Sequence, residues 1–270
     1  MLFFGIVCAV FGSIIGSFLN VVVLRKGVSS LGGRSRCPSC GKEIAAHDLV
    51  PIFSWILLRG KCRYCGSRIS AQYPLVESAT AVLFGLVGAA SFPDFLFSGQ
   101  VALILAARLG VIALLVAITV YDARHTIIPD EWSYSFAALA FMLALTKEQS
   151  LAVVLAGPIA AAPLFLLWLI SRGRWMGLGD PKLALGIGWL LGFPLGVIGV
   201  FASFILGSLV LVPLIVYERA VTHKEADENT SAGLTMKSEV PFGPFLIASC
   251  LIFWVIGLYG VAIPLYLLGL

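Results

Sequence analysis

Residues 1–24 read MLFFGIVCAVFGSIIGSFLNVVVL, and this stretch already indicates the class of fold. It contains no charged side chain, and it exceeds the run of about 20 apolar residues that a helix needs to cross a bilayer. No small-residue cleavage site followed by polar sequence ends it, so we expect a retained membrane span and not a removed signal peptide. Arg25 and Lys26 follow at once, which favours an N-terminus that faces outward.

The composition extends this pattern to the whole chain of 270 residues. Hydrophobic residues make up 60% of it and charged residues 12%, whereas a soluble domain carries about 25% charged residues. We therefore expect an all-α polytopic membrane protein, because a helix satisfies its own backbone hydrogen bonds in lipid. Only the segment 192–196, with its glycines and proline, separates the sixth span from the seventh. The eight expected spans are 2–24, 73–92, 101–121, 131–146, 151–171, 183–198, 199–217 and 243–268.

Basic residues give these spans a direction. With the N-terminus outside, the loops 25–72, 122–130, 172–182 and 218–242 face the cytoplasm and hold 16 of the 18 Lys and Arg residues. This asymmetry follows the positive-inside rule. We therefore interpret the net charge of +4 as a topology signal and not as a sign of nucleic-acid binding.

The long loop 25–72 contains four cysteines at the spacing of a metal site. Cys37 and Cys40 form one C-x2-C pair, and Cys62 and Cys65 form a second pair after 21 intervening residues. Four thiolates with no open position are typical of structural zinc, which would also staple a loop with little core of its own. A redox pair, inert thiols or two disulfides are the alternatives, and a reducing cytoplasm disfavours the disulfides.

Two aspartates stand where an apolar chain rarely keeps a charge. Asp122 ends the apolar stretch 109–121, and Asp180 stands just before another apolar run. A carboxylate at the edge of hydrocarbon is costly unless it is hydrated, paired or protonated, so by default it indicates function. The expected topology places both carboxylates on the cytoplasmic side. The sequence therefore predicts a catalytic acid pair.

The surroundings of Asp180 suggest how it is supported. Gly177 and Gly179 allow a substrate strand to approach the backbone closely. The N-terminus of the helix after Pro181 should keep Asp180 ionised, which leaves Asp122, at a helix C-terminus, as the protonated partner. An N-cap is the non-catalytic alternative for Asp180.

Two neighbouring charged residues need separate interpretations. Asp130 follows a proline and precedes the span 131–146, so capping of that helix explains it. Lys182 either pairs with a carboxylate, holds the substrate or snorkels to the membrane surface.

Other classes of function explain less of the sequence. No His-Glu-x-x-His or Gly-x-Ser-x-Gly pattern is present, so zinc and serine hydrolysis are disfavoured. A proton-coupled transporter would also keep aspartates in spans, but it predicts carboxylates near the midplane and two corresponding halves. A zinc-dependent membrane scaffold explains the cysteines and leaves the aspartates without a role.

The motifs, taken in order, resemble bacterial type IV prepilin peptidases, which are aspartyl intramembrane proteases with a Gly-x-Gly-Asp signature. The signature is matched by Gly177-x-Gly179-Asp180 and continues to Leu183. Further matching segments occur along nearly the whole chain. They are 16–22, the cysteine quartet, 59–62, 69–77, Asp122 with 128–130, and 241–245.

The resemblance implies a membrane enzyme with two activities. Asp122 and Asp180 would cleave the basic leader of type IV prepilins and pseudopilins at the cytoplasmic face of the bacterial inner membrane, serving pili or type II secretion. The enzyme would then methylate the new N-terminal amine with S-adenosylmethionine. The implied division is a first span at 1–24, a cytoplasmic zinc-binding domain at 25–72 and a multi-span protease domain at 73–270.

The methyl-transfer site is the least defined part of this prediction. No glycine-rich strand-turn-helix unit for S-adenosylmethionine is present, and the loop 25–72 is too short for a conventional methyltransferase domain. The nearest acidic candidates are Glu43, Asp48 and Glu77. Solvated or helix-capping carboxylates are the alternative interpretation of Glu43 and Asp48. Glu77 is harder to explain in this way, because it falls just inside the second expected span.

Overall fold

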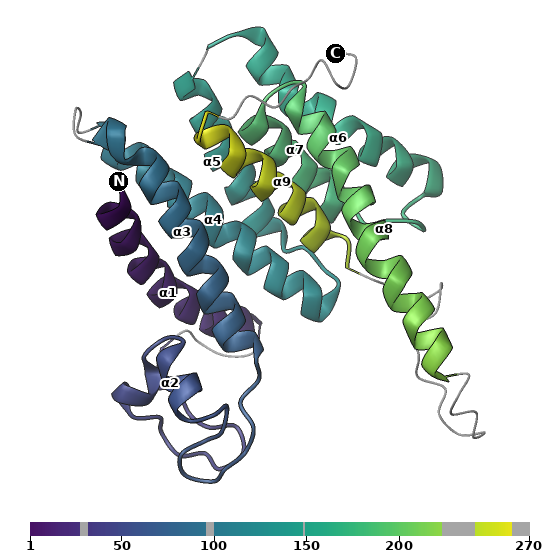
Figure 1. Ribbon diagram of the computed structural model, residues 1–270. Coiled ribbons are helices and arrows are strands. Elements are labelled where there is room, and N and C mark those ends of the chain that lie inside the picture. The colour runs from purple at the N-terminus through teal and green to yellow at the C-terminus, as the bar shows by residue number, and fades with distance from the viewer. Residues whose placement is uncertain (28–31, 96–99, 148, 223–240, 261–270) are drawn as a thin grey trace. The chain divides into compact units, whose positions relative to one another are not determined.

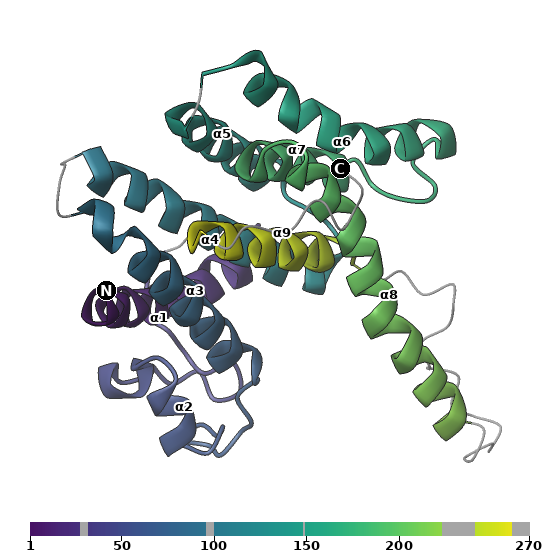
Figure 2. The same ribbon diagram turned by 45° about the horizontal axis from the view of Figure 1, so that its top comes forward.

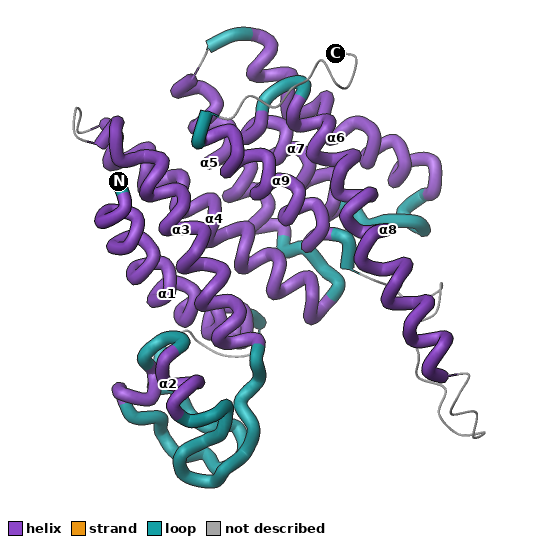
Figure 3. Tube along the Cα trace, in the orientation of Figure 1, coloured by secondary structure: helices purple, strands orange, loops and turns teal. Residues whose placement is uncertain are grey.

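The structure, a computed structural model, describes residues 1–27, 32–95, 100–147, 149–222 and 241–260, and these are mainly helical (Figures 1 and 3). The described residues contain two isolated antiparallel β-bridges, both in the cysteine loop. The all-α prediction is therefore confirmed. The elements are α1 (Leu2–Arg25), η1 (Ala46–Leu49), α2 (Phe53–Leu57), α3 (Gln72–Phe95), α4 (Gln100–His125), α5 (Asp130–Lys147), α6 (Leu151–Ser171), α7 (Gly179–Leu191), α8 (Leu195–Thr222) and α9 (Gly243–Leu258).

Five of the described helices are long and apolar enough to cross a membrane. The candidate spans are Leu2–Arg25, Gln72–Ser91, Val101–His125, Leu151–Ser171 and Leu195–Tyr217. Helix α7 has 13 residues, a length of about 20 Å at 1.5 Å per residue, whereas the hydrocarbon layer is about 30 Å thick. The count of eight spans is therefore not established by helix length and composition.

The break expected at 192–196 is present, but it lies earlier than the boundary predicted at 198–199. Helix α7 ends at Leu191, and Gly192 leaves the helix with a φ of 77°, a conformation that glycine adopts without strain. Helix α8 then begins at Leu195. Most of the expected loop 218–242 and the end of the last expected span, 261–268, lie outside the described residues.

The chain divides into two compact units, and the first comprises Met1–Val120 with Val255–Leu270. In this unit α1 packs along α3 through small residues. A Cβ atom on Gly12 would lie 2.6 Å from Cβ of Phe84, and one on Gly16 would lie 2.8 Å from Cα of Glu77. Glycines therefore set the spacing of these two helices, as is common between membrane helices.

The second unit, Tyr121–Trp254, surrounds the short helix α7. Helix α7 packs against α5, α6 and α8, and Figures 1 and 2 both show it beside α5 and α6. Gly186 faces the ring of Phe136 of α5, and Gly188 faces the backbone of α6 at Ala156. The first residues of α7, which include Asp180, are thereby fixed inside this unit.

Candidate active site

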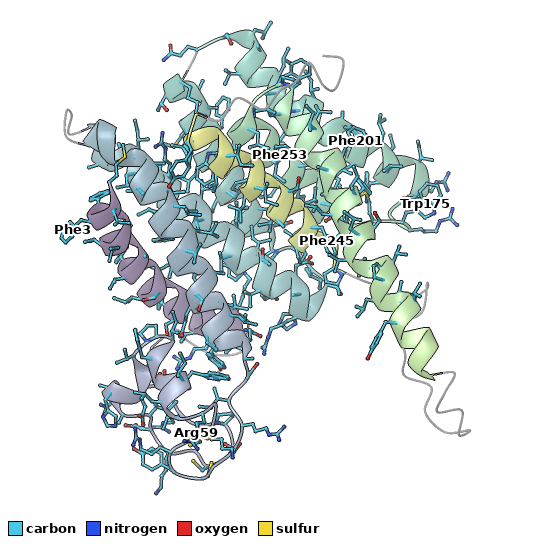
Figure 4. The ribbon with its side chains drawn as sticks, in the orientation of Figure 1. Phe3, Arg59, Trp175, Phe201, Phe245 and Phe253 are labelled. Atoms are coloured by element: carbon cyan, nitrogen blue, oxygen red, sulfur yellow. The ribbon has the colours of Figure 1, made fainter. Side chains whose placement is uncertain are left out.

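Asp122 lies in the last turn of α4 and is buried, with 3% of its surface exposed. Its Oδ2 accepts a hydrogen bond of 3.1 Å from the backbone N–H of Gly243, the first residue of α9. A Cβ atom on Gly243 would lie 2.6 Å from that oxygen, so only glycine fits there without displacing the carboxylate. Figure 4 labels Phe245 in the same first turn of α9.

Asp180 is the second residue of α7 and is also buried, with 9% exposed. The N-cap position belongs to Leu178, and no side-chain hydrogen bond caps this helix. The N-cap alternative is therefore wrong for Asp180. The negative charge of Asp122 acts on Asp180 and disfavours its ionisation.

The burial of Asp180 opposes the ionised state that was expected for it. Asp180 lies outside the five candidate membrane spans, because helix α7 is not one of them. Burial, and then the charge of Asp122, raise the pKa of Asp180 to about 7. Removal from water therefore outweighs the favourable effect of the helix N-terminus, and near neutral pH Asp180 can hold the proton of the pair.

Ile128 lies against two glycines of the site, Gly179 next to Asp180 and Gly243, whose N–H binds Asp122. It lies in the loop between α4 and α5 and is 9% exposed. A Cβ atom on Gly179 would lie 2.9 Å from Cβ of Ile128, and one on Gly243 would lie 3.3 Å from its Cδ1. Gly179 therefore packs against Ile128. Gly177 is exposed, and a Cβ atom on it would meet only the backbone N of Gly179, at 3.9 Å, which suits the close approach expected of a substrate.

Lys182 forms an ion pair with Asp130. Its Nζ lies 2.7 Å from Asp130 Oδ1 and 5.2 Å from the ring centroid of Tyr134. The Asp130 carboxylate raises the pKa of Lys182. Of the three readings of Lys182, the structure shows pairing with a carboxylate. Asp130 stands in the first turn of α5, so its side chain ties that turn to the first turn of α7.

The four cysteines of the loop come together as expected. Their sulfur atoms all lie within 4.8 Å of one another, so they could hold a metal ion. None of the four is in a disulfide. Each pair sits in a similar turn, in which the N–H of Gly41 donates to Cys37 O and the N–H of Gly66 donates to Cys62 O, and both glycines have a φ of 71°. The disulfide alternative is therefore wrong.

The three acidic candidates for methyl transfer each have a different partner. Glu43 accepts hydrogen bonds from Arg34 and Arg36 at 3.2 and 3.0 Å. Arg63 binds both carboxylate oxygens of Asp48 and holds its pKa below the usual range. Glu77 is buried in α3, and its Oε2 accepts a hydrogen bond of 2.7 Å from the N–H of Ile52.

Several residues of this arrangement were not predicted as site residues. Gly243 and Ile128 lie inside two of the segments that resemble the family, 241–245 and 128–130. The sequence therefore marked both residues but did not indicate what they contact. The partner of Lys182 had no local signal, because Asp130 is distant in sequence.

Two family models match separate parts of the chain. The family model described as the bacterial peptidase A24 N-terminal domain matches residues 10–91, a range that includes the four cysteines. The model described as the type IV leader peptidase family matches residues 109–212, a range that includes Asp122 and Asp180.

Curated relatives cover most of the chain. A prepilin leader peptidase/N-methyltransferase of Dichelobacter nodosus is 31% identical over 94% of this chain and 91% of its own length. The protein of the same name from Bacillus subtilis (strain 168) is 30% identical over 92% of both chains. A type 4 prepilin-like proteins leader peptide-processing enzyme of Escherichia coli is 33% identical over 69% of this chain and 77% of its own length. No solved structure matches the chain significantly. The chain therefore belongs to the type IV leader peptidase family.

Proposed function

We propose that this chain is a prepilin leader peptidase and N-methyltransferase of the bacterial inner membrane, with Asp122 and Asp180 as its catalytic acids. The supporting observation is that Asp122 and Asp180 are both buried, come from different helices of one compact unit, and that the negative charge of Asp122 disfavours ionisation of Asp180. Two carboxyl groups that disfavour double ionisation suit a pair that shares one proton.

The surroundings of each carboxyl group support a division of roles in hydrolysis. The Gly243 N–H stabilises negative charge on Asp122, which takes a proton from the attacking water. Asp180, with its pKa of about 7, gives its proton to the oxygen of the scissile carbonyl. As the tetrahedral species breaks down, the C–N bond breaks, the leaving amine takes the proton that Asp122 received, and one hydroxyl of the tetrahedral carbon returns a proton to Asp180, which leaves a carboxylic acid and restores the pair.

The glycines of the signature complete this site. Gly179 allows close packing against Ile128, which keeps the start of α7 beside the end of α4. Gly177 is exposed, so the backbone of a prepilin leader junction could lie against it. The ion pair between Lys182 and Asp130 lies outside the pair of catalytic acids and also helps to hold the start of α7 in place.

Methyl transfer is proposed from the names of the relatives and the chemistry of their product. S-adenosylmethionine supplies a methyl group from its sulfonium sulfur; the new N–C bond replaces the S–C bond, and the amine releases a proton. Glu77 is the candidate to test first, because arginines already neutralise Glu43 and Asp48. Glu77→Gln should lower methylation of pre-cleaved pilin while cleavage of prepilin continues.

The cysteine cluster is proposed as a structural zinc site. Four sulfur donors leave no open position at a tetrahedral ion, so zinc would fix the fold of the loop and would not activate water. We further propose that this domain, 25–72, and both aspartates face the cytoplasm. The first span at 1–24, the protease domain at 73–270 and the total of eight spans belong to the same proposal.

The deciding experiment measures both activities of the purified protein. Wild type, Asp122→Asn and Asp180→Asn are compared for cleavage of a prepilin and for methylation of pre-cleaved pilin. We expect each variant to lose cleavage by about a thousandfold or more and to keep methylation. Asp130→Asn is the matched control, because its carboxylate lies outside the pair. Normal cleavage by either of the first two variants would reject the acid-pair mechanism.

A further inference from the structure

The loop that carries the cysteines also exposes a cluster of apolar side chains that zinc binding does not explain. Leu49, Val50, Phe53, Ile56 and Leu57 are 44%, 46%, 67%, 58% and 81% exposed. Phe53, Ile56 and Leu57 follow the i, i+3, i+4 spacing, so they share one face of α2. We call residues 49–57 the apolar segment.

The opposite side of α2 is attached to the rest of the loop. Trp55 donates a hydrogen bond of 3.2 Å from its indole Nε1 to the carbonyl of Ile69. A Cβ atom on Gly60 would lie 2.9 Å from the Trp55 ring, so the ring packs flush against this glycine. The attachment through Trp55 leaves the face with Phe53, Ile56 and Leu57 directed away from the loop.

A buried carboxylate fixes the apolar segment at a defined level of α3. Ile52 donates its N–H to Oε2 of Glu77, which lies in the candidate span Gln72–Ser91. Glu77 is five residues beyond Gln72, which places it about 7–8 Å along the helix from the start of that span. Amphipathic segments that lie on membranes insert to about 5–10 Å. A bilayer surface at the start of this span would therefore place the segment at the depth of the membrane interface.

The backbone conformation of Ile52 indicates that the surrounding structure holds this residue in place. Ile52 has a φ of 65° and a ψ of −55°, a region that β-branched residues rarely adopt. Such a conformation persists only where its surroundings fix it. Leu75, near the same level of α3, is 67% exposed, so the span itself also exposes an apolar side chain there.

The charge of the loop suits an anionic bilayer surface. Residues 25–72 contain nine Lys and Arg residues but only two acidic ones, Glu43 and Asp48. Both carboxylates are already paired with arginines. Arg59 is exposed two residues after the apolar segment, where Figure 4 labels it in this loop.

We propose that the apolar segment is a membrane-interface element, which inserts Phe53, Ile56 and Leu57 between the headgroups of an anionic bilayer. The insertion holds the cysteine cluster against the membrane. The Glu77–Ile52 hydrogen bond sets its depth.

Site-specific photo-crosslinking in lipid nanodiscs tests this proposal. A photoreactive phenylalanine analogue replaces Leu57 or, in a second variant, Phe53 in the full-length protein. The nanodiscs contain phosphatidylcholine and phosphatidylglycerol. The matched control carries the analogue at Tyr64, which is 46% exposed in the same loop. Intact-mass analysis then identifies the molecule attached to each position.

We expect lipid adducts at Leu57 and Phe53 in at least about fivefold excess over Tyr64, because an inserted side chain contacts acyl chains and a solvated one does not. Equal yields at the three positions would overturn the proposal. Adducts to a second copy of the chain, or to prepilin added to the nanodiscs, in place of lipid would also overturn it and would identify a protein partner for the segment.

Discussion

Asp122 and Asp180 come from the ends of two helices in one unit, whereas the four cysteines come from two similar turns of one loop in the other unit. Packing of glycines against Ile128 and against Asp122 itself positions the acids. Local hydrogen bonds and left-handed glycines position the cysteines. The comparison teaches that each site has its own support, so damage to one should leave the other largely intact.

The largest effect should be the loss of bound zinc when one cysteine of the cluster is replaced. Cys37→Ser or Cys62→Ser removes one of four sulfur ligands and should abolish stoichiometric zinc binding, expected at about one ion per chain. Cleavage of prepilin should fall by less than about tenfold, because the acids lie in the other unit. Bound zinc is measured by elemental analysis of the purified protein. Cys8→Ala, outside the cluster, should keep its zinc; equal zinc in all variants contradicts the site.

The converse test damages the packing around the acids. Gly243→Ala would place a Cβ atom 2.6 Å from Asp122 Oδ2 and must displace that carboxylate. We expect cleavage to fall by about a hundredfold, since small misplacements of catalytic groups have effects of this size, with zinc content unchanged.

A control in the same helix separates this effect from a general loss of helix stability. A Cβ atom on Gly257, also in α9, would meet nothing within 4 Å. Gly257→Ala should therefore cleave prepilin at close to the wild-type rate. If the two variants behave alike, the contact between Gly243 and Asp122 does not matter for cleavage.

How much of each site was predictable depends on the range of the contacts that build it. The C-x2-C spacing determines its own turns, so the sulfur cluster could be predicted from sequence. The helix ends at Asp122 and Asp180 were also visible, because hydropathy changes there. The role of Gly243 was not, since its partner Asp122 is far away in the chain. The raised pKa of Asp180 was not predicted, because burial depends on packing that no local pattern encodes.

The pH dependence of cleavage should show whether Asp180 donates the proton in the reaction. The pKa of Asp180 is raised to about 7, so Asp180 is protonated below that pH and loses its proton above it. Above neutral pH the pair holds two charges and no proton to donate. We expect cleavage to fall by about tenfold per pH unit on the alkaline side.

The measurement is a profile of kcat/KM for cleavage, with methylation of pre-cleaved pilin followed over the same range. Methylation should lack this alkaline decline, because an amine accepts a methyl group only when it has lost its proton. A cleavage rate that stays level well above neutral pH would show that Asp180 is not the proton donor.

The smallest effect should come from the ion pair that supports the start of α7. Asp130 is 62% exposed at its side chain and Lys182 is 22% exposed, so solvent screens their interaction. Exposed pairs contribute about 0.2–1 kcal/mol, which corresponds to a change in rate of up to about fivefold if all of it positions Asp180. Asp130→Asn and Lys182→Met should each lower kcat by no more than this.

Pairing predicts that these two losses are not additive. Once one partner is absent, the other has no ion pair left to lose, so the double variant should cleave about as fast as the slower single variant. A double-mutant cycle on kcat measures this coupling. Fully additive losses would mean that Lys182 contacts the substrate directly, whereas a thousandfold loss in Asp130→Asn would place Asp130 among the catalytic acids.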